Sequence, residues 1–156
     1  MMDRHGDQLL RYLTALVLRR EEAEDLFQET WVRVMEQAES FDPARQFGPW
    51  LFRIARNLAF DRLRWRRRWR FLGVAIGEPA VAGVTVPEPV LAATAEDRLI
   101  SRQLVGKLLA GLDARSREVL WLRFWGGFAY EEIAAVCRVP MGTVKSRLAR
   151  AMQRVA

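Results

Sequence analysis

The stretch LFRIARNLAFDRLRWRRRWR, residues 51–70, carries two different signals on one predicted helix. Apolar residues recur in it at spacings of three and four, which is the pattern of a helix that packs one face against a core. These residues are Leu51, Ile54, Ala55, Leu58, Ala59 and Leu63. The stretch therefore predicts a long helix, from about Trp50 to Arg68, whose other side is free to bind a partner.

The other side of this helix combines cations with an amide, a carboxylate and an aromatic ring. It consists of Arg53, Arg56, Asn57, Phe60, Asp61 and Arg64. Cations bind phosphates, amides and carboxylates read base edges, and aromatic rings stack on unpaired bases. A nucleic acid is the favoured partner, and a membrane surface or an acidic protein is the alternative. The adjacent Arg66, Arg67 and Arg68 point in different directions around a helix, so we expect them to bind phosphates rather than to read one base.

Charge along the chain is divided into blocks. The formal net charge is +6 and the isoelectric point is about 10.6, which favours an acidic partner. Residues 19–42 hold eight acids against three arginines, whereas residues 43–70 hold nine arginines against one acid, Asp61. Residues 138–156 hold five bases and no acid. Two basic surfaces that are separated in sequence suggest two contacts with one long polyanion.

Composition excludes several classes of protein. The single cysteine, Cys137, leaves no disulfide framework and no CxxC metal or redox site, and it is expected in a core. No apolar run reaches about 18 residues, and charged residues interrupt the first twenty positions, so neither a membrane span nor a signal peptide is expected. We therefore expect a cytoplasmic protein. The only histidine, His5, has no carboxylate cluster beside it, which argues against an enzyme.

Helical periodicity dominates the chain, and a weak strand-like alternation occurs only at residues 81–86. Besides the helix at 50–68, the pattern predicts helices at about 7–19, 22–38, 96–110, 114–124, 130–137 and 141–155. Residues 73–95 contain three of the six prolines and three of the ten glycines, which indicates a linker. The expected fold is all-α, with two small helical domains, residues 1–72 and 96–156, joined by a flexible linker.

Residues 130–150, YEEIAAVCRVPMGTVKSRLAR, are typical of a helix-turn-helix, with an ordinary basic αα-hairpin as the alternative. Val144, Leu148 and Met152 are expected to face inward, while the polar residues of the second helix are free to enter a major groove. The turn position that is often glycine in such motifs is Arg138, which would carry a strain of roughly 1 kcal/mol or more if it adopted a left-handed conformation. Ala129 precedes the first helix and has no side-chain oxygen with which to cap it.

The predicted helix at 22–38 has the opposite charge. Asp25, Gln28, Glu29, Val32 and Glu36 share its outer face. A solvated face is the simplest interpretation of a lone acidic stripe. In a chain that must also approach DNA, such a face is better suited to a basic protein partner.

Three motifs together resemble bacterial RNA polymerase sigma factors of the extracytoplasmic-function (ECF) branch. They are AEDLFQETWVRV, FDPARQFGPWLFRIARNLAFDRLR and REVLWLRFWGGFAYEEIAAVCRVPMGTVKSRLARA. The likeness covers both expected domains in the right order, with a variable linker between them. It implies a promoter-specificity subunit that needs no cofactor, metal ion or small-molecule substrate.

The resemblance implies a role for each surface. Asp25, Gln28 and Glu29 match the segment that docks on the coiled coil of the polymerase β′ subunit. The −10 element is matched to the loop 41–49 and the helix after it, through Phe41, Asp42, Arg53, Asn57, Phe60, Asp61, Arg64 and Arg67. The −35 element is matched to Tyr130, Thr143, Lys145, Ser146, Arg147, Ala149 and Arg150. The family also implies contact with the polymerase β flap and control by an anti-sigma factor, which is often membrane-bound.

Two other functions remain open from the residues alone. A freestanding helix-turn-helix regulator would act as a dimer without polymerase, and a nuclease or other enzyme would need a catalytic group that the chain does not offer. Binding to core RNA polymerase distinguishes the first of these from a sigma factor.

Overall fold

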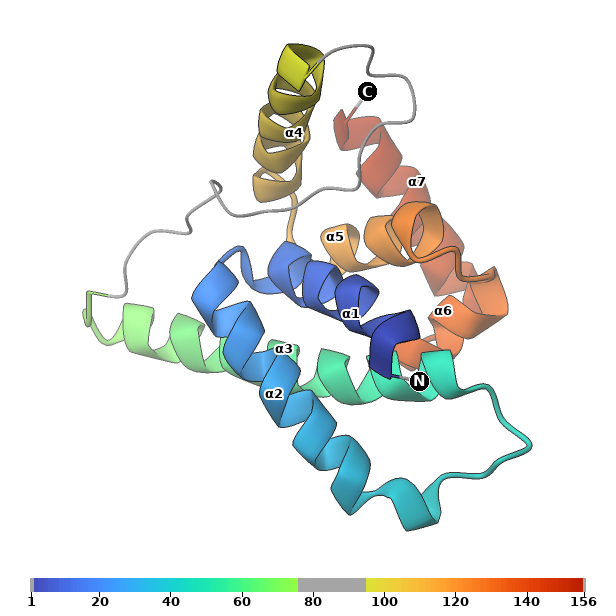
Figure 1. The fold of residues 1–156 in the computed structure, drawn as a ribbon. Helices are drawn as coiled ribbons and strands as arrows, with labels where there is room; N and C mark the ends of the chain where they lie inside the picture. Colours follow the sequence, from blue (N-terminus) through green and yellow to red (C-terminus); the bar gives the residue numbers. More distant parts are fainter. Residues whose placement is uncertain (1, 76–94, 156) are drawn as a thin grey trace.

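The computed structural model of the protein describes residues 2–75 and 95–155, with side chains from residues 5–75 and 103–155. Every regular element in these ranges is helical, which confirms the all-α prediction (Figure 1). The strand-like alternation at 81–86 and most of the expected linker, 73–95, lie outside the described residues.

Three long helices form the first half of the chain. They are α1 (Met2–Val17), α2 (Arg20–Glu36) and α3 (Phe47–Phe71), with a 3-10 turn at Ala38–Ser40 between α2 and α3. α3 begins three residues before the predicted start because Pro49 lies in its first turn, where a missing backbone N–H breaks no helical hydrogen bond. The apolar face predicted for α3 is largely buried against α1 and α2, through Leu51, Ile54, Ala55 and Ala59.

The second half is built from shorter helices. They are α4 (Ala95–Ala110), α5 (Ala114–Leu120), a π-helical turn (Trp121–Trp125), α6 (Tyr130–Cys137) and α7 (Met141–Val155). All agree with the predicted ranges except that the helix expected at 114–124 changes to π geometry after Leu120. The turn ends at Gly126, where an added Cβ would lie 2.8 Å from the ring of Phe128 and 2.9 Å from the carbonyl oxygen of Leu122. Glycine at this position therefore lets Phe128 fold back onto the π-helical turn.

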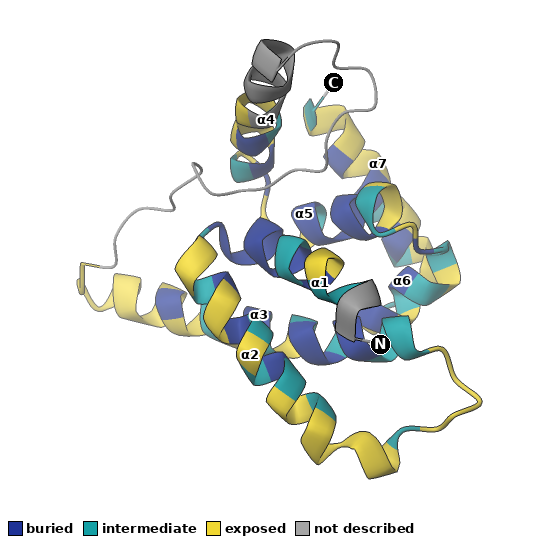
Figure 2. Cartoon of the chain, in the orientation of Figure 1, coloured by how far each residue is buried: buried dark blue, intermediate teal, exposed yellow. Residues whose placement is uncertain are grey.

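The two halves pack directly on each other and share one core, which the sequence did not predict. α1 and α3 contact α5 and α6, and dark blue buried residues run continuously from α1 and α3 into α5 and α6 (Figure 2). At the centre, the ring of Phe52 lies 5.1 Å from that of Tyr12, 5.8 Å from that of Trp121 and 5.1 Å from that of Phe128. Aromatic pairs at such distances add to the stabilisation that burial provides.

Two buried arginines bind the end of α1. The two terminal guanidinium nitrogens of Arg66 in α3, Nη1 and Nη2, donate to the carbonyl oxygen of Val17 at 3.1 and 2.9 Å. Arg117 in α5 donates to the carbonyl oxygens of Ala15 and Leu16 at 2.8 and 2.7 Å. The last carbonyls of a helix have no partner within the helix, so these arginines satisfy groups that burial would otherwise leave unpaired.

Candidate nucleic-acid and protein interfaces

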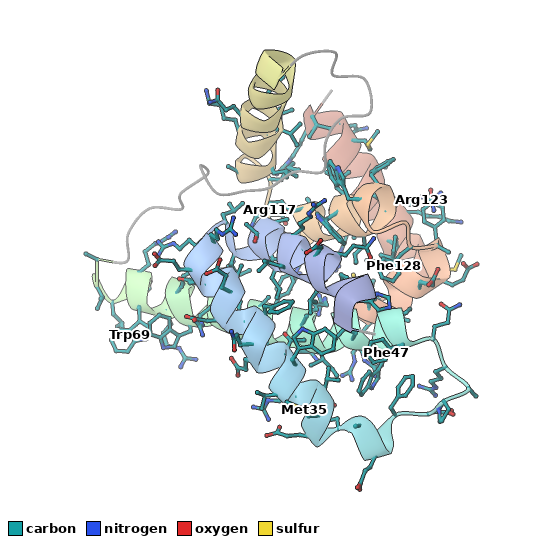
Figure 3. All side chains as sticks on the ribbon, viewed as in Figure 1. Met35, Phe47, Trp69, Arg117, Arg123 and Phe128 are labelled. Carbon is teal, nitrogen blue, oxygen red and sulfur yellow. The ribbon has the colours of Figure 1, made fainter. Side chains whose placement is uncertain are left out.

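The outer face of α2 is exposed and combines acidic with apolar side chains. Asp25 and Gln28 are exposed and Glu29 is half-buried, while the opposite face packs Ala23, Leu26 and Thr30 into the core. Val32, which shares the outer face, is 48% exposed, and nearby Met35 is 69% exposed. Figure 3 places Met35 in the last part of α2, near the 3-10 turn. A partner for this face would therefore offer cations together with apolar surface, and the apolar part was not emphasised by the sequence motif.

The polar side of α3 is accessible along most of its length. Asn57, Asp61, Arg64 and Arg67 are exposed, and Arg53 and Phe60 are half-buried. Asp61 and Arg64, one turn apart, form an exposed ion pair. Asn57 has no such partner among the hydrogen bonds of the described side chains, so its amide is available to a ligand.

Two arginines of α3 that the sequence analysis assigned to DNA binding, Arg56 and Arg66, are not available to DNA in this arrangement. Arg56 turns towards α5, where its Nε donates to Oε1 of Glu118 at 2.7 Å, and its guanidinium lies 4.5 Å from the ring of Phe60. Arg66 was predicted to bind phosphates, and this is wrong for the observed fold. It is buried, binds the end of α1 and lies 3.4 Å from a carboxylate oxygen of Glu22. The periodicity of a single helix cannot show that another helix covers part of its polar side.

The loop that precedes α3 forms an aromatic corner. The ring of Phe41 lies 4.7 Å from that of Trp50 and 5.8 Å from that of Phe47, at the start of α3. Asp42 is exposed, and its Oδ1 accepts a hydrogen bond from the backbone N–H of Ala44 at 3.0 Å. The corner therefore holds the loop in a defined position beside α3.

A pocket of about 340 Å³ opens between this loop, α3 and α6. From the first half of the chain it is lined by Arg45, Gln46, Pro49, Trp50 and Arg53, and from α6 by Glu131, Glu132 and Ala135. Burial, with Arg138 and Arg45 nearby, lowers the pKa of Arg53. Basic residues of one half thus face acidic residues of the other across the pocket.

α6 and α7 form the predicted helix-turn-helix. Arg138 ends α6 in a left-handed conformation, with φ 53° and ψ 47°. Ala129 makes no side-chain cap, but its backbone N–H donates to Oε1 of Glu132 at 3.0 Å, which supplies part of the missing capping. Val144 and Leu148 are buried as expected. Met152 is 46% exposed, and Ala151 occupies the buried position instead, so the inward orientation predicted for Met152 is wrong.

The side of α7 away from the core carries the residues matched to the −35 element. Lys145, Ala149 and Arg150 are exposed, while Thr143, Ser146 and Arg147 are half-buried. The Ser146 hydroxyl donates to the backbone carbonyl of Thr143 at 3.0 Å, and its oxygen remains able to accept from a ligand.

Tyr130 joins this surface from the first turn of α6. Its ring lies 4.6 Å from the guanidinium of Arg123 and 5.8 Å from the ammonium of Lys145. Arg123, on the π-helical turn, was not among the predicted site residues. Its only sequence signal is a charge within the apolar run WLRFW, and the fold brings it to the helix-turn-helix.

The far end of α3 carries an exposed group of aromatic and basic residues. The rings of Trp65 and Trp69 lie 5.7 Å apart, and these residues are 51% and 37% exposed. Arg67, Arg68 and Arg70 are exposed between and beside them. Figure 3 shows Trp69 at the end of α3 that projects away from α5, α6 and α7.

Within the described part of the chain, no three His, Cys, Asp or Glu side chains are grouped so that they could hold a metal ion. None of the helices searched in the same part is long and apolar enough to cross a membrane.

Comparisons with known proteins agree with this architecture. Residues 1–70 match the family described as Sigma-70 region 2, and residues 102–155 match Sigma-70, region 4. The chain is 35% identical over 152 residues to the ECF RNA polymerase sigma factor SigL of Mycobacterium tuberculosis, covering 95% of this chain and 80% of SigL. It is 29% identical over 155 residues to the ECF RNA polymerase sigma factor SigW of Bacillus subtilis, covering 96% of this chain and 82% of SigW.

Two solved structures share the fold. The sigma factor RpoE of Bartonella quintana, in complex with the anti-sigma factor NepR, superposes with a TM-score of 0.74 at 30% identity, covering 99% of this chain and 95% of that one. CnrH, in complex with the cytosolic domain of CnrY, superposes with a TM-score of 0.69 at 27% identity, covering 99% and 81%.

The two matched regions, in this order, define the sigma-70 class of transcription initiation proteins. Within that class, the chain belongs to the ECF family of RNA polymerase sigma factors. Such a protein directs RNA polymerase to promoters and is not itself an enzyme, so the sequence resemblance is confirmed and the freestanding regulator is set aside.

Proposed function

We propose that this sigma factor binds core polymerase and the two promoter elements through three separate surfaces. The outer face of α2, with Asp25, Gln28 and Glu29, docks on the coiled coil of the polymerase β′ subunit. The polar side of α3 and the loop before it bind the −10 element, and α6 with α7 binds the −35 element and lies against the β flap.

The separation of charge on exposed helices supports this division. The exposed polar side chains of α2 are mainly acidic and stand beside the apolar Val32 and Met35, whereas those of α3 and α7 are mainly cationic. A polyanion is repelled by the first surface and attracted by the other two. One helix therefore suits a basic protein and the other two suit DNA.

On the proposed −10 and −35 surfaces, we expect different residues to bind phosphates and to contact bases. Arg53, Arg64, Arg67, Arg147 and Arg150 are the candidates for phosphate binding. Asn57, Lys145, Ser146 and Ala149 are the candidates for contact with base edges, because they expose amide, amine, hydroxyl or methyl groups. Phe41 and Phe60 offer rings on which an unpaired −10 base could stack.

An anti-sigma factor is the proposed regulatory partner. RpoE and CnrH, which share this fold, are each held by a second protein in their solved structures.

We propose two domains, residues 1–72 and 96–156, with a linker between the two DNA-binding surfaces. The proposed place of action is the cytoplasm, where RNA polymerase meets the chromosome.

Reconstituted transcription tests this function. The full chain is mixed with core RNA polymerase, co-purification is measured, and run-off transcripts are read from genomic fragments of its host. Stable binding to core with new start sites supports the proposal. Specific duplex binding by the protein alone, with no effect on core polymerase, would contradict it.

A further inference from the structure

The last turns of α3 project from the body of the protein. Residues 67–75 are all exposed, although the helix itself continues to Phe71, and the buried residues of α3 end at Arg66. Figure 1 shows this end of α3 reaching out to one side of the other helices, and Figure 2 shows it mainly in yellow. We call residues 65–75 the α3 tip.

The α3 tip exposes several large apolar side chains. Trp65, Trp69 and Leu72 follow one another at spacings of four and three, so they share one face of the helix. Phe71 is 90% exposed, the largest value among the large hydrophobic residues whose side chains are described, and Val74 is 45% exposed. Single exposed apolar residues are ordinary, but such a group within a few turns indicates a binding surface.

Cations surround these apolar side chains. Arg67, Arg68 and Arg70 are exposed, and none of them forms an ion pair with another described side chain. Asp61 is the last acid in the sequence before Glu78, so the tip contains no acid of its own. The tip is therefore an apolar surface among arginines whose charges are not neutralised within the described part of the chain.

The surface of an anionic bilayer fits both parts of the α3 tip. Tryptophan rings prefer the level of the lipid headgroups, and phenyl and aliphatic side chains enter the boundary between headgroups and acyl chains. Arginines are attracted by the negative surface potential of anionic lipids. Because arginines alternate with the apolar residues, the tip would lie in the interface of a bilayer rather than cross it.

Two other anionic partners match the α3 tip less well. Single-stranded nucleic acid would bind the arginines and stack its bases on the indole rings, but it offers no apolar layer to the aliphatic Leu72 and Val74. An acidic protein would cover the apolar side chains, but the centre of a protein interface is depleted of charge. In the tip, Arg68 and Arg70 flank Trp69 directly.

We propose that the α3 tip binds the surface of anionic phospholipid bilayers. Its apolar side chains enter the interfacial layer, and its arginines lie at the lipid phosphates. The binding is peripheral and reversible, and it weakens with salt because exposed charges are screened. Arg67 is shared with the proposed −10 surface, whereas Phe71, Leu72 and Val74 have no role in the proposed contacts with polymerase or promoter.

Vesicle flotation with the full chain tests the proposal. Vesicles of phosphatidylglycerol and phosphatidylcholine in equal parts are compared with vesicles of phosphatidylcholine alone. We expect wild type to float with the anionic vesicles and not with the neutral ones, and the bound fraction should fall as salt is added. A wild type that floats with neither kind of vesicle would overturn the proposal.

Matched apolar variants locate the contact. Phe71→Ser with Leu72→Ser removes two exposed apolar side chains of the tip and should weaken binding to anionic vesicles at least about tenfold. Phe124→Ser with Leu104→Ser removes the same residue types at exposed positions of the second half and should bind as wild type does. Circular dichroism checks that helicity is retained. Equal binding by the two variants would place the lipid contact elsewhere on the protein.

Matched charge variants separate the tip from net charge. Arg68→Glu with Arg70→Glu reverses two cations of the tip and should also weaken binding at least about tenfold. Arg115→Glu with Arg154→Glu gives the same change in net charge at exposed positions of the second half and should have a much smaller effect. Equal losses would show that the net charge of the chain, and not the tip, attracts the vesicles.

A nucleic-acid measurement distinguishes lipid from DNA. The probe is a fluorescein-labelled single-stranded oligonucleotide of mixed sequence, read by anisotropy at low salt. Phe71→Ser with Leu72→Ser should bind it as wild type does while losing the vesicles. Loss of oligonucleotide binding by this variant, together with a wild type that does not float, would make the tip a nucleic-acid surface and overturn the proposal. Run-off transcription by wild type tests the proposed function independently of either result.

Discussion

The guanidinium of Arg117 donates a hydrogen bond to the carbonyl oxygen of Leu16 at 2.7 Å, across 101 positions of the sequence. Burial lowers the pKa of Arg117 to about 10, so the side chain still carries its charge at neutral pH. It also donates to the carbonyl oxygens of Ala15 and Leu112. One buried cation thus caps α1 from the other half of the chain.

Arg117→Met is expected to lower the free energy of unfolding by about 3 kcal/mol, because it leaves several buried carbonyls without a donor. Urea unfolding followed by circular dichroism measures this change. Arg115→Met, at an exposed position of the same helix, should change stability by less than about 0.5 kcal/mol. Equal effects of the two variants would show that the cap contributes nothing.

Asp25→Arg combined with Glu29→Arg is expected to abolish association with core polymerase and to leave the fold intact, because both residues lie on the outer face of α2. Co-purification with core polymerase and thermal unfolding are measured together. The matched control reverses two exposed acids on other helices, Asp7→Arg in α1 with Glu131→Arg in α6. If the outer-face variant still co-purifies with core as wild type does, the acidic stripe is only a solvated face.

Asn57→Ala is expected to change base preference rather than general affinity. Its exposed amide can donate and accept in fixed geometry, and such contacts discriminate by roughly 1–3 kcal/mol. Initiation from a library of −10 variants should therefore relax at one or two positions, with an almost unchanged dependence on salt. A uniform loss across the library would assign Asn57 to general binding.

Arg67→Ala is expected to weaken initiation on all promoters alike. Arg67 is exposed on α3, and a phosphate contact is independent of sequence. The slope of log affinity against log salt should fall by up to about one phosphate contact. Arg66→Ala provides the contrast, because Arg66 is buried and its loss should lower stability rather than the salt slope. A sequence-dependent effect of Arg67→Ala would contradict this division.

Arg138→Gly is expected to raise stability by about 1 kcal/mol. Arg138 adopts a left-handed conformation with φ 53°, which glycine adopts without the strain that a side chain imposes. Thermal unfolding should show a higher midpoint. Gly127→Ala tests the opposite change at φ 68° and should lower the midpoint. An unchanged or lower midpoint for Arg138→Gly would indicate that its side chain compensates for the strain.

The Cys137 thiol is expected to react slowly, because it is buried in the folded chain. Burial, together with the carboxylate of Glu118, raises its pKa to about 12. At pH 8 the thiolate is therefore scarce, and alkylation by iodoacetamide should be about a thousandfold slower than in the unfolded chain. The rate should rise about tenfold per pH unit until the pH nears 12. Rapid labelling of wild type at pH 8 would place the thiol in solvent, and the single cysteine makes the readout specific.

The sequence alone determined the class of fold and the family. Helical periodicity predicted every described long helix, because one face of each helix packs on a core through regularly spaced apolar residues. The largest difference in the ends is at α1, which begins at Met2 rather than at the predicted residue 7. The buried position of Cys137 was also predicted from the sequence. The family was identified from three motifs, because they fix residue types at the surfaces that meet polymerase and DNA.

Only the tertiary structure decided which polar residues of these helices are accessible. Arg56, Arg66 and Arg67 all lie on α3, yet the first binds Glu118, the second caps α1 and the third is exposed. Met152 fits the inward pattern of α7 but is exposed, since the core ends at Ala151. The periodicity of a sequence describes one helix at a time. Burial of a helix depends also on which distant segment of the chain packs against it. Direct packing of the two halves around Glu118 is therefore a property of the folded chain that no local pattern contains.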